Sequence, residues 1–135
     1  MKQTCASPLF LILVLFAGCG GDLKTYRIPG KLVYEDGSPV PGASVVLQTK
    51  VGDQIVAARG VASPDGRFDL ATFKEADGVV AGEHEVSISP LPVAEGVKVA
   101  RPVIPALYWD FATSGLKTTV APDTPEIILT INRSK

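Results

Sequence analysis

Apolar and polar residues alternate along several short stretches of the chain, and turns rich in glycine and proline separate these stretches. Alternation with a period of two places the apolar side chains on one face of a strand. The pattern predicts strands over residues 26–34, 43–49, 56–62, 67–71, 83–89, 116–120 and 126–131. No stretch of the mature chain shows the apolar stripe of an amphipathic helix. About seven short strands with frequent turns are typical of an all-β antiparallel sandwich.

Five of the predicted strands, over 26–34, 43–49, 67–71, 83–89 and 126–131, have one apolar face that we assign to the core. The residues on these faces are Ile28, Leu32, Tyr34, Ala43, Val45, Leu47, Phe68, Leu70, His84, Val86, Ile88, Ile127, Leu129 and Ile131. Pro29 cannot donate a hydrogen bond, so the first strand is expected to lie at a sheet edge or to begin after this residue. Residues 116–120 and 126–131 are expected to pair with each other, and residues 71–82 and 90–115 to form connections without regular structure. Small residues in 56–62 are expected to let the facing sheet approach closely.

The N-terminus has the features of a secretion signal. Lys2 precedes an apolar stretch over residues 8–16, which is shorter than the roughly 20 residues that span a bilayer. The sequence Phe16-Ala17-Gly18-Cys19 resembles a bacterial lipobox, which implies cleavage before Cys19 and lipidation of its thiol. The alternative is an ordinary signal cleaved near Ala17. The first reading divides the chain into a signal over 1–18, a lipidated tether over 19–25 and a domain over 26–135.

Lipidation at Cys19 implies a membrane-anchored protein of the bacterial cell envelope, on the periplasmic or surface side. Cys5 would leave with the signal, so the mature chain could form no internal disulfide. The charge is balanced, with 13 Lys and Arg against 14 Asp and Glu, and no basic patch appears. Nucleic acid is therefore excluded as an expected partner, whereas envelope proteins or polysaccharide remain candidates.

Two segments, GKLVYEDGSPVPGASVVL and SPDGRFDL, resemble the carboxypeptidase regulatory-like domain. The resemblance implies a seven-stranded antiparallel Greek-key sandwich of the transthyretin-like (prealbumin-like) type, without a known enzymatic activity or cofactor. The whole mature chain also resembles small lipoproteins of planctomycete-type bacteria, with a close match over residues 104–116. Leu107 stands where that pattern has lysine, and Phe111 where it has proline.

His84 is the only histidine in the chain, so a catalytic triad or an imidazole metal site would have to use it. It lies in phase with Val86 and Ile88, which indicates packing at the margin of the core. The carboxylates expected in turns are Asp36, Asp53, Asp65 and Asp77. Such carboxylates could serve calcium binding or glycoside hydrolysis. Aspartates in turns also bond to their own backbone, and this reading predicts no metal and no cofactor.

The aromatic cluster Tyr108, Trp109 and Phe111 is the one surface candidate. Either its rings form a platform for a sugar or a protein partner, or they plug one end of the sandwich. Pro105 favours an extended chain around it, in which neighbouring side chains point to opposite sides. Tyr108 is then predicted to pack inward together with Ile104 and Ala106. Leu107 and Trp109 are predicted to face solvent, as candidate contacts for a ligand or partner.

These observations favour a non-enzymatic lipoprotein with a structural or protein-interaction role at the cell envelope. The alternative is a carbohydrate-binding module that uses the loop 108–111. An enzyme built on a cleft around His84 is a third and more distant reading.

Overall fold

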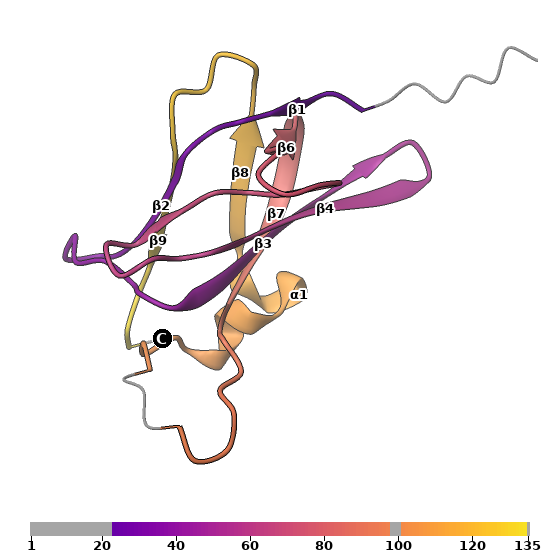
Figure 1. Cartoon of the computed structure of the whole chain (residues 1–135). Helices are drawn as coiled ribbons and strands as arrows, with labels where there is room; N and C mark the ends of the chain where they lie inside the picture. The colour runs from indigo at the N-terminus through magenta and orange to yellow at the C-terminus, as the bar shows by residue number, and fades with distance from the viewer. Residues whose placement is uncertain (1–22, 98–100, 135) are drawn as a thin grey trace, which may run out of the picture.

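The computed structural model describes residues 23–97 and 101–134, and the described part is an all-β fold, as the alternation predicts (Figure 1). The expected signal over 1–18 and the lipidation residue Cys19 lie outside the described residues. Nine strands occur in the described part: β1 (Thr25–Tyr26), β2 (Gly30–Tyr34), β3 (Ala43–Val51), β4 (Gln54–Val61), β5 (Arg67–Phe68), β6 (Val79–Val80), β7 (Gly82–Pro90), β8 (Leu116–Val120) and β9 (Ile127–Ile131). β1 begins at Thr25, within the expected tether.

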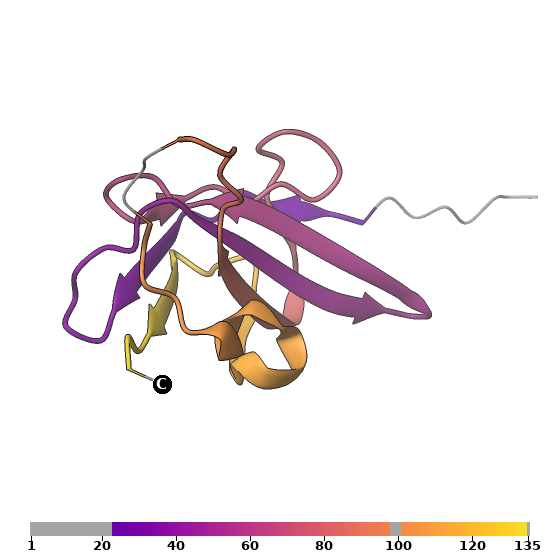
Figure 2. The same ribbon diagram turned by 90° about the horizontal axis from the view of Figure 1, so that it is seen from below.

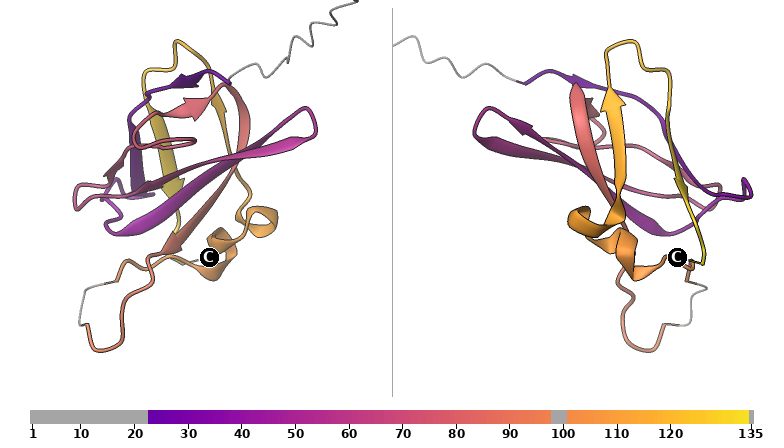
Figure 3. Two further views of the ribbon diagram at one scale, coloured as in Figure 1. Left: turned by 45° about the vertical axis from the view of Figure 1, so that its right-hand side comes forward. Right: turned by 180° about the vertical axis from the view of Figure 1, so that it is seen from behind.

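The strands form two main sheets that face each other (Figures 1 and 3). One has four strands in the order β4-β3-β7-β8, and the other has three in the order β5-β2-β9. All pairs are antiparallel except β2 with β9, which run parallel with Gly30 opposite Ile127. The expectation of a wholly antiparallel fold is therefore wrong at this pair.

The predicted pairing of residues 116–120 with 126–131 is also wrong. β8 pairs with β7 and β9 pairs with β2, so the turn between β8 and β9 carries the chain from one sheet to the other. Alternation fixes which face of a strand is buried, but it does not specify the neighbouring strand. Both strands still bury their apolar faces, and the error concerns only their partners.

The core lies between the two main sheets and contains every residue that the sequence assigns to the buried faces. Leu32, Val45 and Leu47 have no exposed surface, and neither do Val86 and Ile88. A buried side chain of this size stabilises the fold by about 1.5–3 kcal/mol relative to an exposed one. The period-two prediction of the core is confirmed.

Pro29 precedes β2, which begins at Gly30 and lies in the middle of its sheet. Of the two expectations for Pro29, a later start is confirmed and an edge position is wrong. The carbonyl of Pro29 accepts a hydrogen bond from the Ile127 amide at 2.9 Å, so the residue still joins the sheet. Gly30 lies under the ring of Phe68, since a Cβ at this position would fall 2.2 Å from that ring.

One side of the sandwich is closed by residues 67–71, which take part in both sheets. After pairing with β2 at Phe68, the chain exchanges two 2.9 Å backbone hydrogen bonds between Ala71 and Arg59 of β4. At Gly60 the backbones approach so closely that a Cβ would lie 2.6 Å from the Asp69 carbonyl oxygen. The expected close approach is confirmed here, and the predicted strand over 67–71 is instead divided between two partners.

Residues expected as connections contain short regular elements. β6 lies within 71–82 and pairs with β1, with Val80 opposite Thr25. The connection over 90–115 contains a 3₁₀ helix, η1 (Ala106–Trp109), and one turn of α-helix, α1 (Phe111–Ser114). Elements of two to four residues are too short to show a periodicity in the sequence. Both helices lie at the end of the molecule opposite β1 (Figures 1 and 2).

Within the described residues, no helix has the length and apolar character needed to cross a membrane.

Candidate functional site

Tyr108 belongs to the core rather than to a binding surface. Its side chain is 5% exposed, and its hydroxyl oxygen accepts a hydrogen bond from the Asn132 amide at 3.0 Å. η1 therefore joins the long connection to the end of β9. The predicted inward orientation of Tyr108 is confirmed, and with it the reading that an aromatic ring closes one end of the sandwich.

Trp109 lies on the surface with 52% of its area exposed, as predicted. Its indole Nε1 donates a hydrogen bond to the Ile104 carbonyl oxygen at 3.0 Å. This bond uses the one polar atom of the side chain and fixes the ring against the loop. An apolar, oriented aromatic surface is left facing solvent.

The reasoning that led to these orientations was only partly right, because residues 106–109 form a 3₁₀ helix instead of an extended run. Ala106 is exposed rather than packed, and Leu107 is half-buried against the core rather than facing solvent. A helix with three residues per turn directs consecutive side chains about 120° apart, so strict alternation does not apply. The predicted solvent-facing orientation is therefore wrong for Leu107, and Trp109 is the exposed residue of the two.

The three aromatic residues of the cluster do not form a continuous platform. Tyr108 is buried, Phe111 is half-buried at the start of α1, and Trp109 alone is exposed. Asp110 separates the two helices and caps α1, since its carboxylate accepts a hydrogen bond from the Ala112 amide at 2.8 Å. This cap holds α1 in place directly after the exposed tryptophan.

His84 is buried in β7 with 1% of its surface exposed, and packing with Val86 and Ile88 is confirmed. Its Nδ1 lies 3.0 Å from the Gly82 carbonyl oxygen, and its Nε2 has no hydrogen-bond partner within the described residues. Burial lowers the pKa of His84, and the hydrogen bond to Gly82 offsets this only in part. The side chain is therefore a neutral core imidazole at pH 7.

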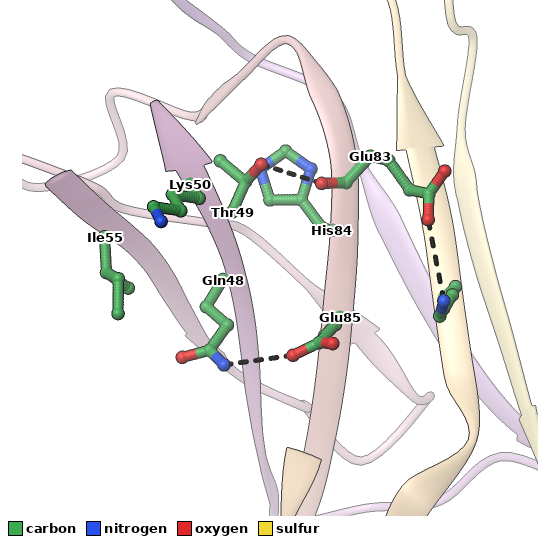
Figure 4. Close-up of a pocket in the computed structure, with 8 residues that line it drawn as sticks. Gln48, Thr49, Lys50, Ile55, Glu83, His84 and Glu85 are labelled. Carbon is green, nitrogen blue, oxygen red and sulfur yellow. Dashed lines mark hydrogen bonds and ion pairs between the residues drawn. The ribbon is translucent and has the colours of Figure 1, made fainter. Parts of the chain in front are cut away.

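A shallow groove of about 300 Å³ lies beside His84 (Figure 4). It is lined by Gln48, Thr49, Lys50, Ile55, Glu83, His84, Glu85 and Lys117. The polar side chains around the histidine are bonded to one another across the strands. Gln48 donates to Glu85 at 3.2 Å, Lys117 lies 3.7 Å from the Glu83 carboxylate, and Thr49 donates to the Glu83 carbonyl at 2.7 Å. Neither carboxylate has a hydrogen bond to the imidazole.

Three of the candidate carboxylates support turns, as their positions in the sequence predict. Asp36 accepts hydrogen bonds from the amide and the hydroxyl of Ser38, and Asp65 accepts them from the Ser63 hydroxyl and the Arg67 amide. These bonds lower the pKa of both carboxyl groups. The largest cause is the hydroxyl of Ser38 for Asp36 and the hydroxyl of Ser63 for Asp65. These carboxylates are already used by the fold.

Asp77 is the most enclosed of the candidates, with 7% of its surface exposed. Its oxygens accept hydrogen bonds from the amides of Thr72, Phe73 and Lys74 at 2.7, 3.0 and 3.2 Å. Burial alone would raise the pKa of Asp77, but these three amides together outweigh it and lower the pKa. The carboxylate therefore organises the loop between β5 and β6.

Asp53 lies in the β3–β4 turn and is exposed. Across residues 23–97 and 101–134, no three His, Cys, Asp or Glu side chains are grouped so that they could hold a metal ion.

Arg133 makes a contact that the sequence did not suggest. Its guanidinium lies 3.8 Å from the centre of the Tyr34 ring, and one nitrogen is 3.0 Å from the Asp36 carboxylate. The contact joins the chain after β9 to the β2–β3 turn. An isolated charge after a strand has no periodicity, so only the three-dimensional arrangement reveals its partners.

The comparisons with family models, with curated proteins and with solved structures found no match to this chain.

Proposed function

We propose that the protein is a non-enzymatic lipoprotein, exported and anchored through Cys19, which acts as a protein-interaction module at the bacterial cell envelope. The proposed domain type is the carboxypeptidase regulatory-like domain with a Greek-key, transthyretin-like topology. The turn motif supports this assignment, because Gly37, Gly42 and Gly66 have the positive φ angles that the motif's glycines permit. The N-terminal sequence supports export and anchoring.

The observation that carries the interaction role is the exposed ring of Trp109. It is fixed by its bond to Ile104 and supported by a buried neighbour, Tyr108. Tryptophan is enriched among the residues that dominate binding energy at protein interfaces. The described chain begins near β1. The helices η1 and α1 lie at the other end of the molecule (Figure 3). A domain anchored at its N-terminus would thus present Trp109 on the side remote from the lipid.

The state of His84 supports a role without catalysis. A general base must reach the proton that it removes, directly or through one water. His84 is buried in β7, and the Glu83 and Glu85 carboxylates beside it bond to other side chains. Its neutral imidazole is accounted for by packing.

The anchoring proposal is tested by labelling cells with a clickable fatty acid. Wild-type protein is expected to take up the label and to fractionate with membranes, whereas Cys19→Ala should remain as unlabelled precursor. A wild-type protein that is unlabelled and found in the soluble fraction would contradict the proposal. An ordinary signal cleaved near Ala17 would give that result.

The interaction role is tested by placing a photoreactive amino acid at position 109 in cells. We expect a discrete cross-linked partner from position 109. The matched control is position 55, because Ile55 is 68% exposed but lies on β4. Equal cross-linking from both positions, or none from position 109, would contradict a specific surface at Trp109.

A carbohydrate-binding module is the second candidate, and the apolar face of Trp109 is the observation that favours it. A ring whose Nε1 is already bonded can still stack against the C–H face of a sugar. A glycan array separates the two roles. Saturable binding to a polysaccharide, lost in Trp109→Ala, would favour the module over a protein partner.

A further inference from the structure

β9 is an edge strand, and its main-chain groups alternate between bonding to β2 and pointing away from it. The Ile127 amide donates to Pro29, and the Ile131 carbonyl accepts from Glu35. In a parallel pair, residues 127, 129 and 131 therefore direct both polar groups toward β2. The N–H and C=O groups of Ile128 and Thr130 point to the opposite side, where the described residues provide no strand.

The edge of β9 lacks the features that usually prevent pairing with another chain. Edge strands are commonly protected by lysine, proline, a bulge or a covering segment. β9 reads Ile-Ile-Leu-Thr-Ile, and both Ile128, at 61% exposure, and Thr130 are exposed. By contrast, β8 carries Lys117, and β4 is bonded to Ala71 through Arg59. β9 is thus an unprotected edge of the described sandwich.

A cleft of about 390 Å³ lies beside this edge, between the end of β9 and the start of β8. Its lining residues are Glu35, Leu107, Tyr108, Ser114, Gly115, Leu116, Thr130, Ile131 and Asn132. Leu107 and Leu116 provide apolar surface, and Glu35 is the one charged residue of the lining. The Glu35 carboxylate accepts a hydrogen bond from the side-chain amide of Asn132 at 2.8 Å, and this bond holds the carboxylate at the cleft. An apolar wall with a carboxylate suits the long stem and charged end of lysine or arginine.

We propose that β9 binds an extended segment of a partner protein as an additional strand, with a basic side chain of that segment in the cleft at Glu35. Strand addition uses main-chain hydrogen bonds for affinity and pockets for alternate side chains for specificity. Here the groups of Ile128 and Thr130 supply the hydrogen bonds, and the cleft supplies the pocket. The inference refines the proposed interaction role and rests on it, but it concerns a different surface from Trp109.

The test is a selection of short linear peptides, displayed on phage, against the full chain. We expect enrichment of sequences with β-branched residues at alternate positions and one lysine or arginine. A selected peptide synthesised with N-methyl groups on alternate amides should lose binding, because methylation removes the donors that pair with β9. Amide chemical-shift changes in the protein are expected at residues 128–131.

Three variants locate the site. Thr130→Pro removes an outward N–H without removing a bond to β2, and it should reduce peptide affinity at least tenfold. Thr130→Val keeps the N–H and should bind as wild type does. Glu35→Gln keeps an oxygen that can accept from Asn132 but removes the charge. Its affinity for peptides with the basic residue should fall to that for peptides without it. An unchanged circular dichroism spectrum shows that each variant is folded.

Several results would overturn the proposal. These are no enrichment, enrichment of acidic peptides, or equal binding by wild type and Thr130→Pro. Binding lost in Trp109→Ala but kept in Thr130→Pro would reject strand addition and leave the proposed role of Trp109 intact. Sedimentation of the wild type as a dimer that Thr130→Pro dissociates would show that a second copy, not a partner peptide, occupies β9.

Discussion

Individual carboxylates of this protein hold turns together, and Asp77 does so most completely. Three consecutive amides donate to it, and the Thr72 hydroxyl donates to the Gly78 carbonyl at 2.7 Å beside it. Backbone amides are hydrogen-bond donors that need partners in the folded chain. A single side chain supplies those partners here, so the conformation of the loop depends on one residue.

Replacing Asp77 should therefore destabilise the domain. Asp77→Ala leaves three amides without their acceptor and is expected to cost about 1.5–3 kcal/mol of unfolding free energy. Asp77→Asn should cost less, since its side-chain oxygen can still accept. Asp53→Asn is the control, because Asp53 lies exposed in a different turn. Denaturant midpoints measure the effect, and equal midpoints for Asp77→Ala and Asp53→Asn would contradict it.

The lowered pKa of Asp77 also sets a pH dependence. An unfolded aspartate titrates near pH 4, so the folded state binds fewer protons than the unfolded state just below that pH. The contribution of Asp77 is complete above about pH 4 and is lost as the pH falls through the lower folded-state pKa. The stability difference between wild type and Asp77→Ala should accordingly shrink in acid. A difference that stays constant from neutral pH to about pH 2 would contradict this assignment.

His84 gives a second pH dependence at higher pH. Burial lowers its pKa. The imidazole therefore takes up a proton near pH 6.5 in the unfolded state but stays neutral at that pH in the folded state. Stability is expected to fall as the pH drops below about 6.5, by up to about 1.4 kcal/mol per unit. His84→Leu should lack this slope. Urea titrations between about pH 5 and 8 provide the measurement, and identical slopes for both proteins would refute it.

At the scale of elements, turns depend on backbone angles that only glycine adopts easily. Gly66 has a φ of +81°, and a Cβ there would lie 2.5 Å from the Leu32 carbonyl oxygen. Its own carbonyl accepts from the Leu32 amide at 2.8 Å, so the turn is bonded to β2. Gly66→Val should destabilise the domain strongly through both strain and overlap. Gly37→Val is a useful control, since its φ is also positive but nothing lies within 4 Å of a Cβ there. A smaller loss at Gly66 than at Gly37 would contradict the close contact.

The two aromatic residues of η1 should differ in their contributions. Tyr108→Ala is expected to lose about 3 kcal/mol or more, because it removes a buried ring and the acceptor of the Asn132 amide. Trp109→Ala should lose less, since half of the ring is exposed. Acrylamide should quench the fluorescence of Trp109, the single tryptophan. An unquenchable tryptophan, or a larger loss from Trp109→Ala, would reverse the assignment.

Sequence reasoning succeeds for strands and fails for the short helices, for a physical reason. Alternation in β3 or β9 repeats often enough to identify the buried face. η1 and α1 have four residues each, which is about one turn, so no period can be read. The sequence correctly placed Trp109 on the surface, but it did so from an extended geometry that the chain does not adopt.

At the scale of the whole molecule, the core of the sandwich should dominate stability. Leu47 has no exposed surface, and Leu47→Ala is expected to cost about 2–5 kcal/mol. Ile55→Ala, on the exposed face of β4, should cost little, because Ile55 is 68% exposed. Thermal or chemical unfolding distinguishes them, and similar losses would mean that the assigned core is wrong.

Strand order was the least predictable feature of the molecule. The sequence of each strand predicts which face is buried, but the neighbours of that strand depend on pairings between distant residues. β8 and β9 are neighbours in sequence and lie in different sheets, whereas β2 and β9 are distant in sequence and adjacent in space. The same limit applies to the candidate sites. The burial of His84 could be predicted from its position within one strand, but the open edge of β9 depends on the order of the strands in the folded sheet.

The pairing of β2 with β9 has a consequence for the order in which the chain can fold. Gly30 meets Ile127, so the three-stranded sheet gains its parallel pair only after about 100 further residues have been made. Contacts between such distant residues form slowly. On the proposed route through the membrane, the N-terminal signal emerges from the ribosome long before β9 exists. Until then β2 lacks one neighbour, so the three-stranded sheet cannot be complete. The late arrival of a single strand would thus delay completion of the fold to the far side.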